Sequence, residues 1–281
     1  MTNIAFVHRG GEEMASYRYR CLIPGIELET AGYNVTYNEG DAHICVFSKP
    51  VMNDLTMAKV IAAKGCRVVV DICDDHFAHP DLGYVYGKML EIADYIVCPT
   101  ENMKFRMQEF TEKDITVIGD PYEIGACEPH AEGNELLWFG HNVNLGEIEP
   151  YLSHNPHVVT GPTVPEWDNA SQWSLDTLKL ALSRANKVLL PTREGTGYKS
   201  PNRLINAIMG GCFPICDPHP ANEEFKDFVW TGDIYTGLRW AREFEGDLNA
   251  SIELAQNYIE DHYSPEAIGF KWIQLMRMIE S

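Results

Sequence analysis

Short apolar segments alternate with segments of helical period along the whole chain. We expect strands where β-branched residues cluster, at 4–8, 43–48, 67–72, 95–100 and 115–120. We expect helices between them, at 15–31, 52–64, 84–93 and 101–110. Apolar strands connected through helices are typical of a parallel sheet that is covered by helices on both faces.

The alternation pauses at 121–135, which is rich in Pro, Gly and acidic residues and which we interpret as an interdomain linker. It then resumes, with strands expected at 136–141, 157–161, 187–192 and 213–217 and helices near 173–185, 201–210, 247–263 and 265–280. In the last helix we expect Ser264 as the N-cap and Pro265 as the first helical residue. Two successive α/β sheets are therefore predicted, and a single larger doubly wound sheet is the alternative.

Composition disfavours several classes of function. The 22 Lys+Arg against 41 Asp+Glu give a formal charge of −19, which repels polyanions and disfavours extensive nucleic-acid binding. No apolar run reaches the roughly 18 residues of a membrane span, and we see no secretion signal, so we expect a cytoplasmic protein. The eight cysteines form no C-x-x-C pair, which favours reduced core thiols over a zinc site.

The segment "YKSPNRLINAIMGG" (198–211) places two cations at the start of a predicted helix. Ser200 is expected as the N-cap and Pro201 as the first helical residue, with Lys199 just before them and Arg203 in the first turn. Free N–H groups and the helix dipole attract anions to such a start. An ammonium, a guanidinium and backbone amides can therefore converge on one diphosphate.

The preceding "PTREGTG" (191–197) follows a predicted strand. Its glycines let the backbone approach a ligand closely, and Glu194 can accept hydrogen bonds from ribose hydroxyls. This arrangement suits a nucleotide leaving group whose negative charge grows in the transition state.

The stretch "PTREGTGYKSPNRLINAIMGGCFPICD", with "LLWFGHNVNL" before it and "DIYTGLRWA" after it, resembles the donor half of GT-B glycosyltransferases. The N-terminal half is similar more loosely, through "SYRYRCLIPGIELETAGYNV" and "VVVDICDDHF". The resemblance implies two Rossmann-like domains that face each other across a cleft, here 1–125 for the acceptor and 126–262 for the donor. It also implies a closing helix (263–281) that returns to the first domain, a nucleotide-sugar co-substrate, and no metal required for the chemistry.

Carried over residue by residue, the resemblance implies that Lys199 and Arg203 bind the donor phosphates and that Glu194 holds the sugar or the ribose. The rest of the implied donor segment is Gly195, Gly197, Tyr198, Ser200, Pro201 and Asn202. Many retaining members carry a second glutamate in the donor helix, near Asn206 and Ala207 of this chain. The stereochemical outcome therefore stays open.

The first predicted strand ends at His8 and is followed by a glycine pair. Gly10 and Gly11 would bring backbone amides to a donor, although the full G-x-G-x-x-G pattern is absent. Arg18 and Arg20 are two positions apart on the next helix and cannot share one face. We expect Arg18 to contact phosphate or acceptor, with a solvated surface role as the alternative.

"DICDDHF" (71–77) follows the carboxyl end of another strand, where open α/β sheets bind ligands. Asp74, Asp75 or His76 could take the proton of an acceptor hydroxyl, as an inverting mechanism requires. The carboxylates could instead bind a divalent ion, or simply cap the next turn, although the spacing is not the Asp-x-Asp of the single-domain GT-A enzymes. His8 is a competing general base.

Gly140, His141 and Asn142 follow "LLWF" and are expected to border the donor cleft or to cap the next helix. Together these features predict a glycosyltransferase that moves a sugar from a nucleotide-diphosphate sugar to a hydroxyl acceptor. A metal-dependent, GT-A-like transferase and a non-catalytic binder of nucleotides or sugar phosphates are the alternatives. An NAD-linked oxidoreductase is disfavoured because the glycine fingerprint after the first strand is missing.

Overall fold

The computed structural model describes residues 2–39, 42–192 and 198–281, which form two compact units. Unit 1 comprises Met1–Pro121, Tyr198–Ser200 and His262–Ser281, and unit 2 comprises Tyr122–Gly197 and Pro201–Asp261. Each unit contains one six-stranded sheet, and all pairings between described strands are parallel. The prediction of two parallel α/β sheets is confirmed, and the single-sheet alternative is wrong.

The sheet of unit 1 has the strand order β2-β1-β3-β4-β5-β6. Its strands are β1 (Asn3–Val7), β2 (Asn34–Tyr37), β3 (Ile44–Ser48), β4 (Arg67–Asp71), β5 (Tyr95–Cys98) and β6 (Ile115–Val117). Successive residues of a strand point to opposite faces, and both faces here are apolar. In β3, Ile44 and Val46 belong to one buried cluster, whereas Cys45 and Phe47 belong to the other.

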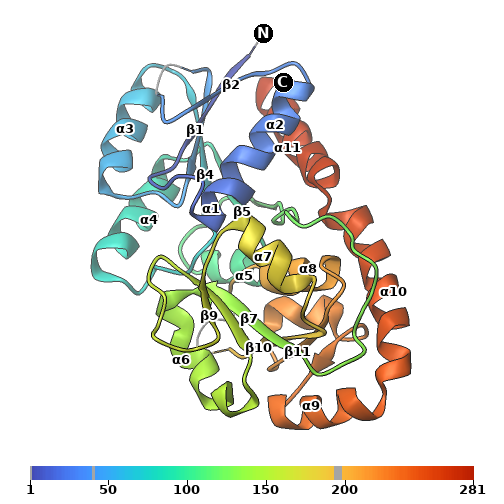
Figure 1. The fold of residues 1–281 in the computed structure, drawn as a ribbon. Helices are drawn as coiled ribbons and strands as arrows, with labels where there is room; N and C mark the ends of the chain where they lie inside the picture. The colour runs from blue at the N-terminus through green and yellow to red at the C-terminus, as the bar shows by residue number, and fades with distance from the viewer. Residues whose placement is uncertain (1, 40–41, 193–197) are drawn as a thin grey trace. The chain divides into compact units, whose positions relative to one another are not determined.

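Helices cover both faces of this sheet (Figure 1). They are α1 (Ala15–Tyr17), a π-helix at Arg18–Leu22, α2 (Ile23–Thr30), α3 (Met52–Ala63), α4 (Pro80–Ile92), α5 (Glu101–Met107) and α11 (Pro265–Glu280). The π-helix joins α1 to α2 within the span predicted as one helix, 15–31. A π-turn inside a helix redirects side chains, and π-turns are frequent at functional sites.

The C-terminal helix α11 packs on unit 1, as expected. Ser264 is its N-cap and accepts the N–H of Ala267 at 3.2 Å, and Pro265 is its first residue. Trp272 is fully buried and meets Phe6 of β1 edge-on, with ring centroids 5.8 Å apart. In Figure 1 α11 runs beside α2, and a Cβ at Gly269 would lie 2.4 Å from Glu27 Cβ. The two helices are therefore in direct contact.

The sheet of unit 2 has the order β12-β11-β10-β7-β8-β9. Its strands are β7 (Leu136–His141), β8 (His157–Gly161), β9 (Ala170–Gln172), β10 (Lys187–Leu190), β11 (Phe213–Cys216) and β12 (Trp230–Thr231). Its α-helices are α6 (Leu145–Ile148), α7 (Leu175–Leu182), α8 (Asn202–Met209), α9 (Ile234–Glu243) and α10 (Glu245–Tyr263), the last of which ends in unit 1. Short 3₁₀ segments lie at Asn142–Asn144, Glu149–His154 and Pro220–Phe225.

Helix α8 begins one residue later than predicted. Pro201 is its N-cap, and the carbonyl of Pro201 accepts the Ile205 N–H at 3.0 Å. No side chain caps this helix start, and Ser200 belongs to unit 1. The prediction of Ser200 as the N-cap is therefore wrong, because Pro201 takes that position and the Ser200 Oγ is buried without a hydrogen-bond partner among the described residues.

Candidate functional site

Open parallel sheets bind ligands beyond the carboxyl ends of their strands, where the strand order reverses. In unit 2 the chain runs from β7 outward to β8 and β9 and then returns to β10 on the other side of β7. The reversal therefore lies between β7 and β10. In unit 1 the same argument places it between β1 and β3.

At the reversal in unit 2, Arg203 of α8 reaches the carboxyl end of β7. Its Nη1 lies 3.4 Å from the point that a Cβ on Gly140 would occupy, so the guanidinium lies directly beside this glycine. Its Nη2 is 3.5 Å from Glu147 Oε2, a long ion pair whose carboxylate is almost fully buried. The structure thus brings together two residues predicted from the sequence, Gly140 and Arg203.

The guanidinium of Arg203 has unused hydrogen-bonding capacity. Its Nη1 is buried without a hydrogen-bond partner among the described residues, and so is the Oδ1 of Asn142 next to the end of β7. A buried unpaired donor costs about 1–3 kcal/mol, more for a charged group, and an anionic oxygen would relieve that cost. A guanidinium is well suited to a phosphate because it presents parallel N–H groups. This position is therefore equipped to hold an anion.

His141 contacts a residue close to it in the sequence. Its Nδ1 accepts the N–H of Val143 at 3.3 Å, which caps the short 3₁₀ turn that follows β7. Its ring is exposed. The capping alternative considered from the sequence is thus observed for His141.

Part of the predicted donor segment, Glu194, Gly195 and Gly197, lies outside the described residues. Just before it, the Thr192 N–H donates to Asp217 Oδ2 at 3.1 Å, which joins the carboxyl ends of β10 and β11. Burial raises the pKa of Asp217, and the hydrogen bond from Thr192 opposes that rise. Asp217 follows β11 directly and was not predicted as a site residue.

Lys199 and its neighbours Tyr198 and Ser200 belong to unit 1. The Lys199 side chain is exposed, and its positive charge contributes to lowering the pKa of Asp74. Asn202 and Pro201 lie at the start of α8 in unit 2. The two predicted cations thus belong to different units.

At the reversal in unit 1, the residues after β1 are tied to one another. The Gly10 N–H donates to His8 Nδ1 at 2.8 Å, and His8 Nε2 lies 3.0 Å from Ser16 Oγ. The Gly11 N–H donates to Glu13 Oε1 at 3.0 Å. Both glycine amides predicted to meet a donor are therefore engaged locally, and so are both ring nitrogens of His8. Burial lowers the pKa of His8, so its ring is neutral at pH 7.

Lys49 follows β3 and forms an ion pair with Asp74, with Nζ 2.5 Å from Oδ2. Burial alone would raise the pKa of Asp74, but Lys49, His76 and Lys199 together lower it below its usual value. Lys49 has a φ of 52°, in the left-handed region that costs a non-glycine residue roughly 1–3 kcal/mol. Lys49 was not predicted, although its place directly after a strand end was a usable signal.

Asp75 is held by Arg106 of α5. The Arg106 Nε donates to Asp75 Oδ2 at 3.0 Å, and Asp75 Oδ1 accepts the Phe77 N–H at 3.2 Å. His76 is half-buried, and burial lowers the pKa of its ring. The segment after β4 therefore presents two paired carboxylates and one neutral imidazole.

The arginines of the π-helix are both buried. Arg18 Nη1 donates to the Glu12 carbonyl at 2.5 Å. Arg20 is bound to Asp71 through two of its nitrogens, with Nε 3.0 Å from Oδ2, and its Nη1 lies 3.1 Å from Asp120 Oδ1. Arg20 and Asp71 thus form a buried ion pair beneath the carboxyl edge of the sheet.

Asn206 and Ala207, which stand near the place of the second glutamate, are both buried. Asn206 Oδ1 accepts the backbone N–H groups of Glu123 at 3.1 Å and Ile124 at 3.2 Å. Asn206 therefore fastens the first residues of unit 2 to α8.

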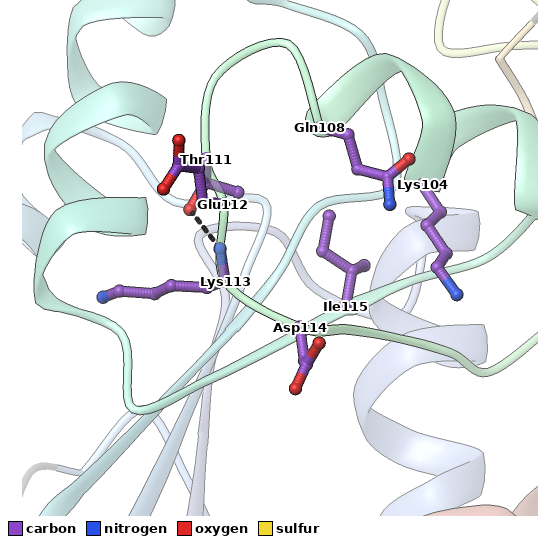
Figure 2. Close-up of a pocket in the computed structure, with 7 residues that line it drawn as sticks. All are labelled: Lys104, Gln108, Thr111, Glu112, Lys113, Asp114 and Ile115. Carbon is purple, nitrogen blue, oxygen red and sulfur yellow. Dashed lines mark hydrogen bonds between the residues drawn. The ribbon is translucent and has the colours of Figure 1, made fainter.

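A pocket of about 460 Å³ lies away from these strand ends, beside the start of β6 (Figure 2). Its lining residues are Lys104, Gln108, Thr111, Glu112, Lys113, Asp114 and Ile115. Lys113 Nζ is committed to the carbonyls of Leu90, Glu91 and Ala93 at the end of α4. Because this is the amino edge of a parallel sheet, we do not assign it to the functional site.

Two further observations bear on ligands and environment. Within the described ranges, no group of three or more His, Cys, Asp or Glu side chains is placed to hold a metal ion. No helix in the described part of the chain is long and apolar enough to cross a membrane.

Solved structures resemble this chain over 83–100% of its length. An alpha-glucosyltransferase in complex with UDP-glucose and DNA containing an abasic site is 12% identical, with 100% of both chains covered and a TM-score of 0.69. HepE from Anabaena, in complex with UDP-glucose, is 9% identical, with 99% of this chain and 100% of that chain covered and a TM-score of 0.75. TarM is 13% identical, with 83% of this chain and 54% of that chain covered and a TM-score of 0.60.

This chain has the GT-B fold. No protein-family profile and no curated protein matches the sequence. At 9–13% identity the likeness concerns the fold, so the function has to be argued from the site.

Proposed function

We propose that this protein is a glycosyltransferase that moves a sugar from a nucleoside-diphosphate sugar to a hydroxyl acceptor. The observation that carries the proposal is the buried Nη1 of Arg203, which has no hydrogen-bond partner among the residues that the structure describes and lies at the strand-order reversal of unit 2. A diphosphate is the ligand that a guanidinium and the nearby start of α8 would both favour. Proteins with the same fold are described with UDP-glucose or UDP bound.

Arg203 is proposed as the principal phosphate ligand, with Lys199 as a second cation. Both would neutralise the charge that builds on the departing diphosphate, which is how such sites accelerate transfer. Glu194, Gly195, Gly197, Tyr198 and Asn202 stay predictions as donor contacts, and Arg18, Gly10 and Gly11 stay predictions in unit 1. We propose that the reaction needs no metal ion.

The proton acceptor that we propose for an inverting reaction is His76. Asp74 is a weak base because its pKa is lowered, and Asp75 is bound to Arg106. His8 has both ring nitrogens engaged. The His76 ring is neutral at pH 7, follows β4 and is half-buried, which suits a general base. Asp74 would then keep its charge and stabilise positive charge that develops on the sugar.

The acceptor that we propose is a hydroxyl compound that is not a polyanion. One structural neighbour is described with DNA. A chain with a charge of −19 repels a long phosphate backbone, because such binding depends on lysines and arginines that release counterions. The cytoplasmic location expected from the sequence stays a prediction.

The test is binding and turnover by an Arg203→Ala variant. UDP, GDP, ADP, CDP and TDP sugars are screened by thermal shift with the wild-type protein, since a ligand of the native state raises its apparent stability. For the donor that binds, Arg203→Ala should weaken affinity about 10- to 100-fold, the value of one or two charged hydrogen bonds. Arg242→Ala, an exposed arginine of α9, is the matched control and should bind as the wild type does.

Sugar transfer or donor hydrolysis then separates an enzyme from a binding protein. Turnover that is lost in Arg203→Ala and kept in Arg242→Ala supports the proposal. Equal donor affinity in the wild type and in Arg203→Ala would refute the role of this guanidinium. Saturable binding without any turnover, across a panel of acceptors, would point to the non-catalytic alternative.

A further inference from the structure

His76 directly follows two aspartates, each of which is bound by a cation. The backbone N–H of His76 donates to the carbonyl of Asp74 at 3.1 Å, which closes a tight turn after β4. In the described part of the chain neither Asp74 nor Asp75 forms a hydrogen bond with the imidazole. A carboxylate this close to a histidine is a ready acceptor for the ring N–H, so the partners that the two aspartates have instead need an explanation.

Lys49 binds the first of these carboxylates. The Lys49 N–H donates to the Asp71 carbonyl at 3.0 Å, which extends the pairing of β3 with β4, so Lys49 lies beside the start of segment 72–77. Its φ of 52° is a strained conformation for a lysine, and its Nζ lies 2.5 Å from Asp74 Oδ2. The two side chains are only 28% and 24% exposed, so water and salt screen this ion pair little.

Arg106 of α5 binds the second carboxylate. Its Nε donates to Asp75 Oδ2 at 3.0 Å, and Asp75 Oδ1 accepts the backbone N–H of Phe77 at 3.2 Å. The guanidinium carbon of Arg106 also lies 5.0 Å from the centroid of the Phe110 ring, within the range of a cation–π contact. Both oxygens of Asp75 therefore have a partner, and the arginine that binds one of them is itself held in place.

The His76 ring has no hydrogen-bond partner among the residues that the structure describes. It is half-buried and lies against Tyr86, with ring centroids 6.0 Å apart. His79, three residues further along, is different, because its Nδ1 accepts the N–H groups of Asp81 and Leu82 at 3.3 Å and so caps α4. Of these two neighbouring histidines, His79 has a structural contact and His76 keeps its ring nitrogens for a ligand.

Opposing charges surround the His76 ring. Burial lowers the pKa of the ring, the two aspartates raise it, and Lys49 and His79 lower it. An aspartate that lost its cation would favour the imidazolium more strongly, because an unpaired carboxylate beside the ring can accept its N–H. The phenol of Tyr86 carries no charge, since burial raises its pKa. The groups that face the ring are Asp74, Asp75, Lys49, His79, Tyr86 and Arg106.

We infer that Lys49 and Arg106 are positioning residues, which bind the two aspartates before His76 and so leave its imidazole free to take the proton of an acceptor hydroxyl. The inference rests on the proposed function, because it takes His76 as the proton acceptor. It adds two residues that act on this base without touching the substrate. Both of them, and His76 itself, belong to unit 1.

The test is the ionisation midpoint of His76, measured by an NMR pH titration of the full chain. The signal of this ring is the one that is missing from a His76→Gln variant. The main variants are Lys49→Met and Arg106→Met, because methionine keeps an apolar stem and removes the charge. Lys88→Met is the matched control, since Lys88 also pairs with a carboxylate of unit 1, that of Glu91 at 2.7 Å on α4.

We expect Lys49→Met to raise the His76 midpoint by about 1 pH unit, the effect of one carboxylate that becomes available next to a titrating group. Arg106→Met should raise it less, because the Phe77 N–H still binds Asp75. Lys88→Met should leave the midpoint unchanged. Lys49→Arg, which keeps the cation, should behave as the wild type does.

Two further measurements show whether the effect passes through Asp74 and whether it reaches catalysis. In an Asp74→Asn background, Lys49→Met should have little further effect, because residues that act through a common partner are not additive. In sugar transfer, the acid limb of the profile of kcat/KM against pH should move to higher pH together with the His76 midpoint, since a general base has to be unprotonated.

The outcomes separate the inference from the function on which it rests. A midpoint that does not rise in Lys49→Met or in Arg106→Met overturns the positioning role and leaves the proposed transfer reaction standing. An equal rise with and without Asp74 shows that Lys49 acts on the ring directly, which also overturns it. A midpoint that rises while the pH profile stays in place shows that His76 is not the base, so that assignment and the inference fail together.

Two cases remain decidable by the same titration. If Lys49→Met does not fold, Arg106→Met decides the question at Asp75, the other carboxylate beside the ring. If the wild-type protein transfers no sugar from any nucleotide sugar, the proposed function and the catalytic part of the inference fail, and the NMR midpoints still show whether the two cations control the ionisation of His76.

Discussion

Replacing Arg20 by leucine should strongly destabilise unit 1. The guanidinium donates to both oxygens of Asp71, to Asp120 and to the carbonyls of Ile118 and Gly119, and it is fully buried. Leucine would leave two buried carboxylates without their cation. Removing one partner of a buried ion pair costs about 3–5 kcal/mol, because the other charge stays uncompensated.

The matched control is Arg67→Leu in the same sheet. Arg67 pairs with Asp94 at 3.3 Å, but its side chain is 56% exposed. Exposed ion pairs contribute about 0–1 kcal/mol, so this variant should be nearly as stable as the wild type. Two arginines of one unit, each paired with aspartate, thus differ in burial and in the number of groups to which they donate.

The destabilisation of Arg20→Leu should depend on pH. The pKa of Asp120 is already raised by burial, and Arg20 limits that rise, so its loss raises the pKa further. A carboxyl group whose pKa is higher in the folded state than its unfolded value of about 3.9 destabilises the folded state. This destabilisation is complete at pH values above the folded-state pKa. That penalty decreases as pH falls through the folded pKa. The difference between variant and wild type should therefore be smaller at pH 5 than at pH 8.

The assay is urea denaturation followed by circular dichroism at both pH values. Hydrogen exchange of peptides from β4 and β6 shows whether the loss of stability lies in unit 1, since local opening free energies differ between regions of a protein. With a urea m-value of about 3 kcal/mol/M, the midpoint should fall by roughly 1 M or more. An Arg20→Leu midpoint no lower than that of Arg67→Leu, or a loss that grows as pH falls, would refute the reasoning.

Two further predictions concern unit 1. Gly269→Ala should lower stability by about 1–3 kcal/mol, because the new Cβ would lie 2.4 Å from Glu27 Cβ and push α11 away from α2; an unchanged thermal midpoint would contradict this. The His8 ring should titrate below its ordinary pKa of about 6.5 in an NMR pH titration, because burial disfavours the charged form. Since the unfolded chain then binds the proton more readily, this group should reduce stability as pH falls below about 6.5. A midpoint at or above 6.5 would show that burial does not control this ring.

The structural elements that were predicted correctly share one property. Buried strands such as β3 and β4 have a continuous apolar stretch, Ile44–Phe47 and Val68–Val70, and the flanking helices repeat apolar residues at helical spacing, so local sequence shows both. The strands that were not predicted, β2, β9 and β12, lie at sheet edges. Edge strands are short and partly exposed, so they lack a continuous apolar signal.

Helix starts were predicted well only where the cap contact is local. Ser264 caps α11 by accepting the backbone N–H of Ala267, three residues further along the chain, as its sequence pattern indicates. Ser200 precedes a proline in the same way, yet no side chain caps α8, and the Ser200 Oγ is buried without a hydrogen-bond partner among the described residues. A capping pattern states which contacts are available to a serine, and the tertiary structure decides whether they form.

The sequence by itself determined the α/β class, the two parallel sheets, the C-terminal helix and the neighbourhood of Arg203, because these follow from short-range periodicity and from residues close together in the chain. Only the tertiary structure decided which charges are paired. Arg20 with Asp71, Lys49 with Asp74 and Arg106 with Asp75 are contacts between distant segments. Burial then sets how much each ion pair matters for stability, because a charge removed from water needs a partner of opposite charge. Local sequence does not show which residues the fold brings next to a buried charge.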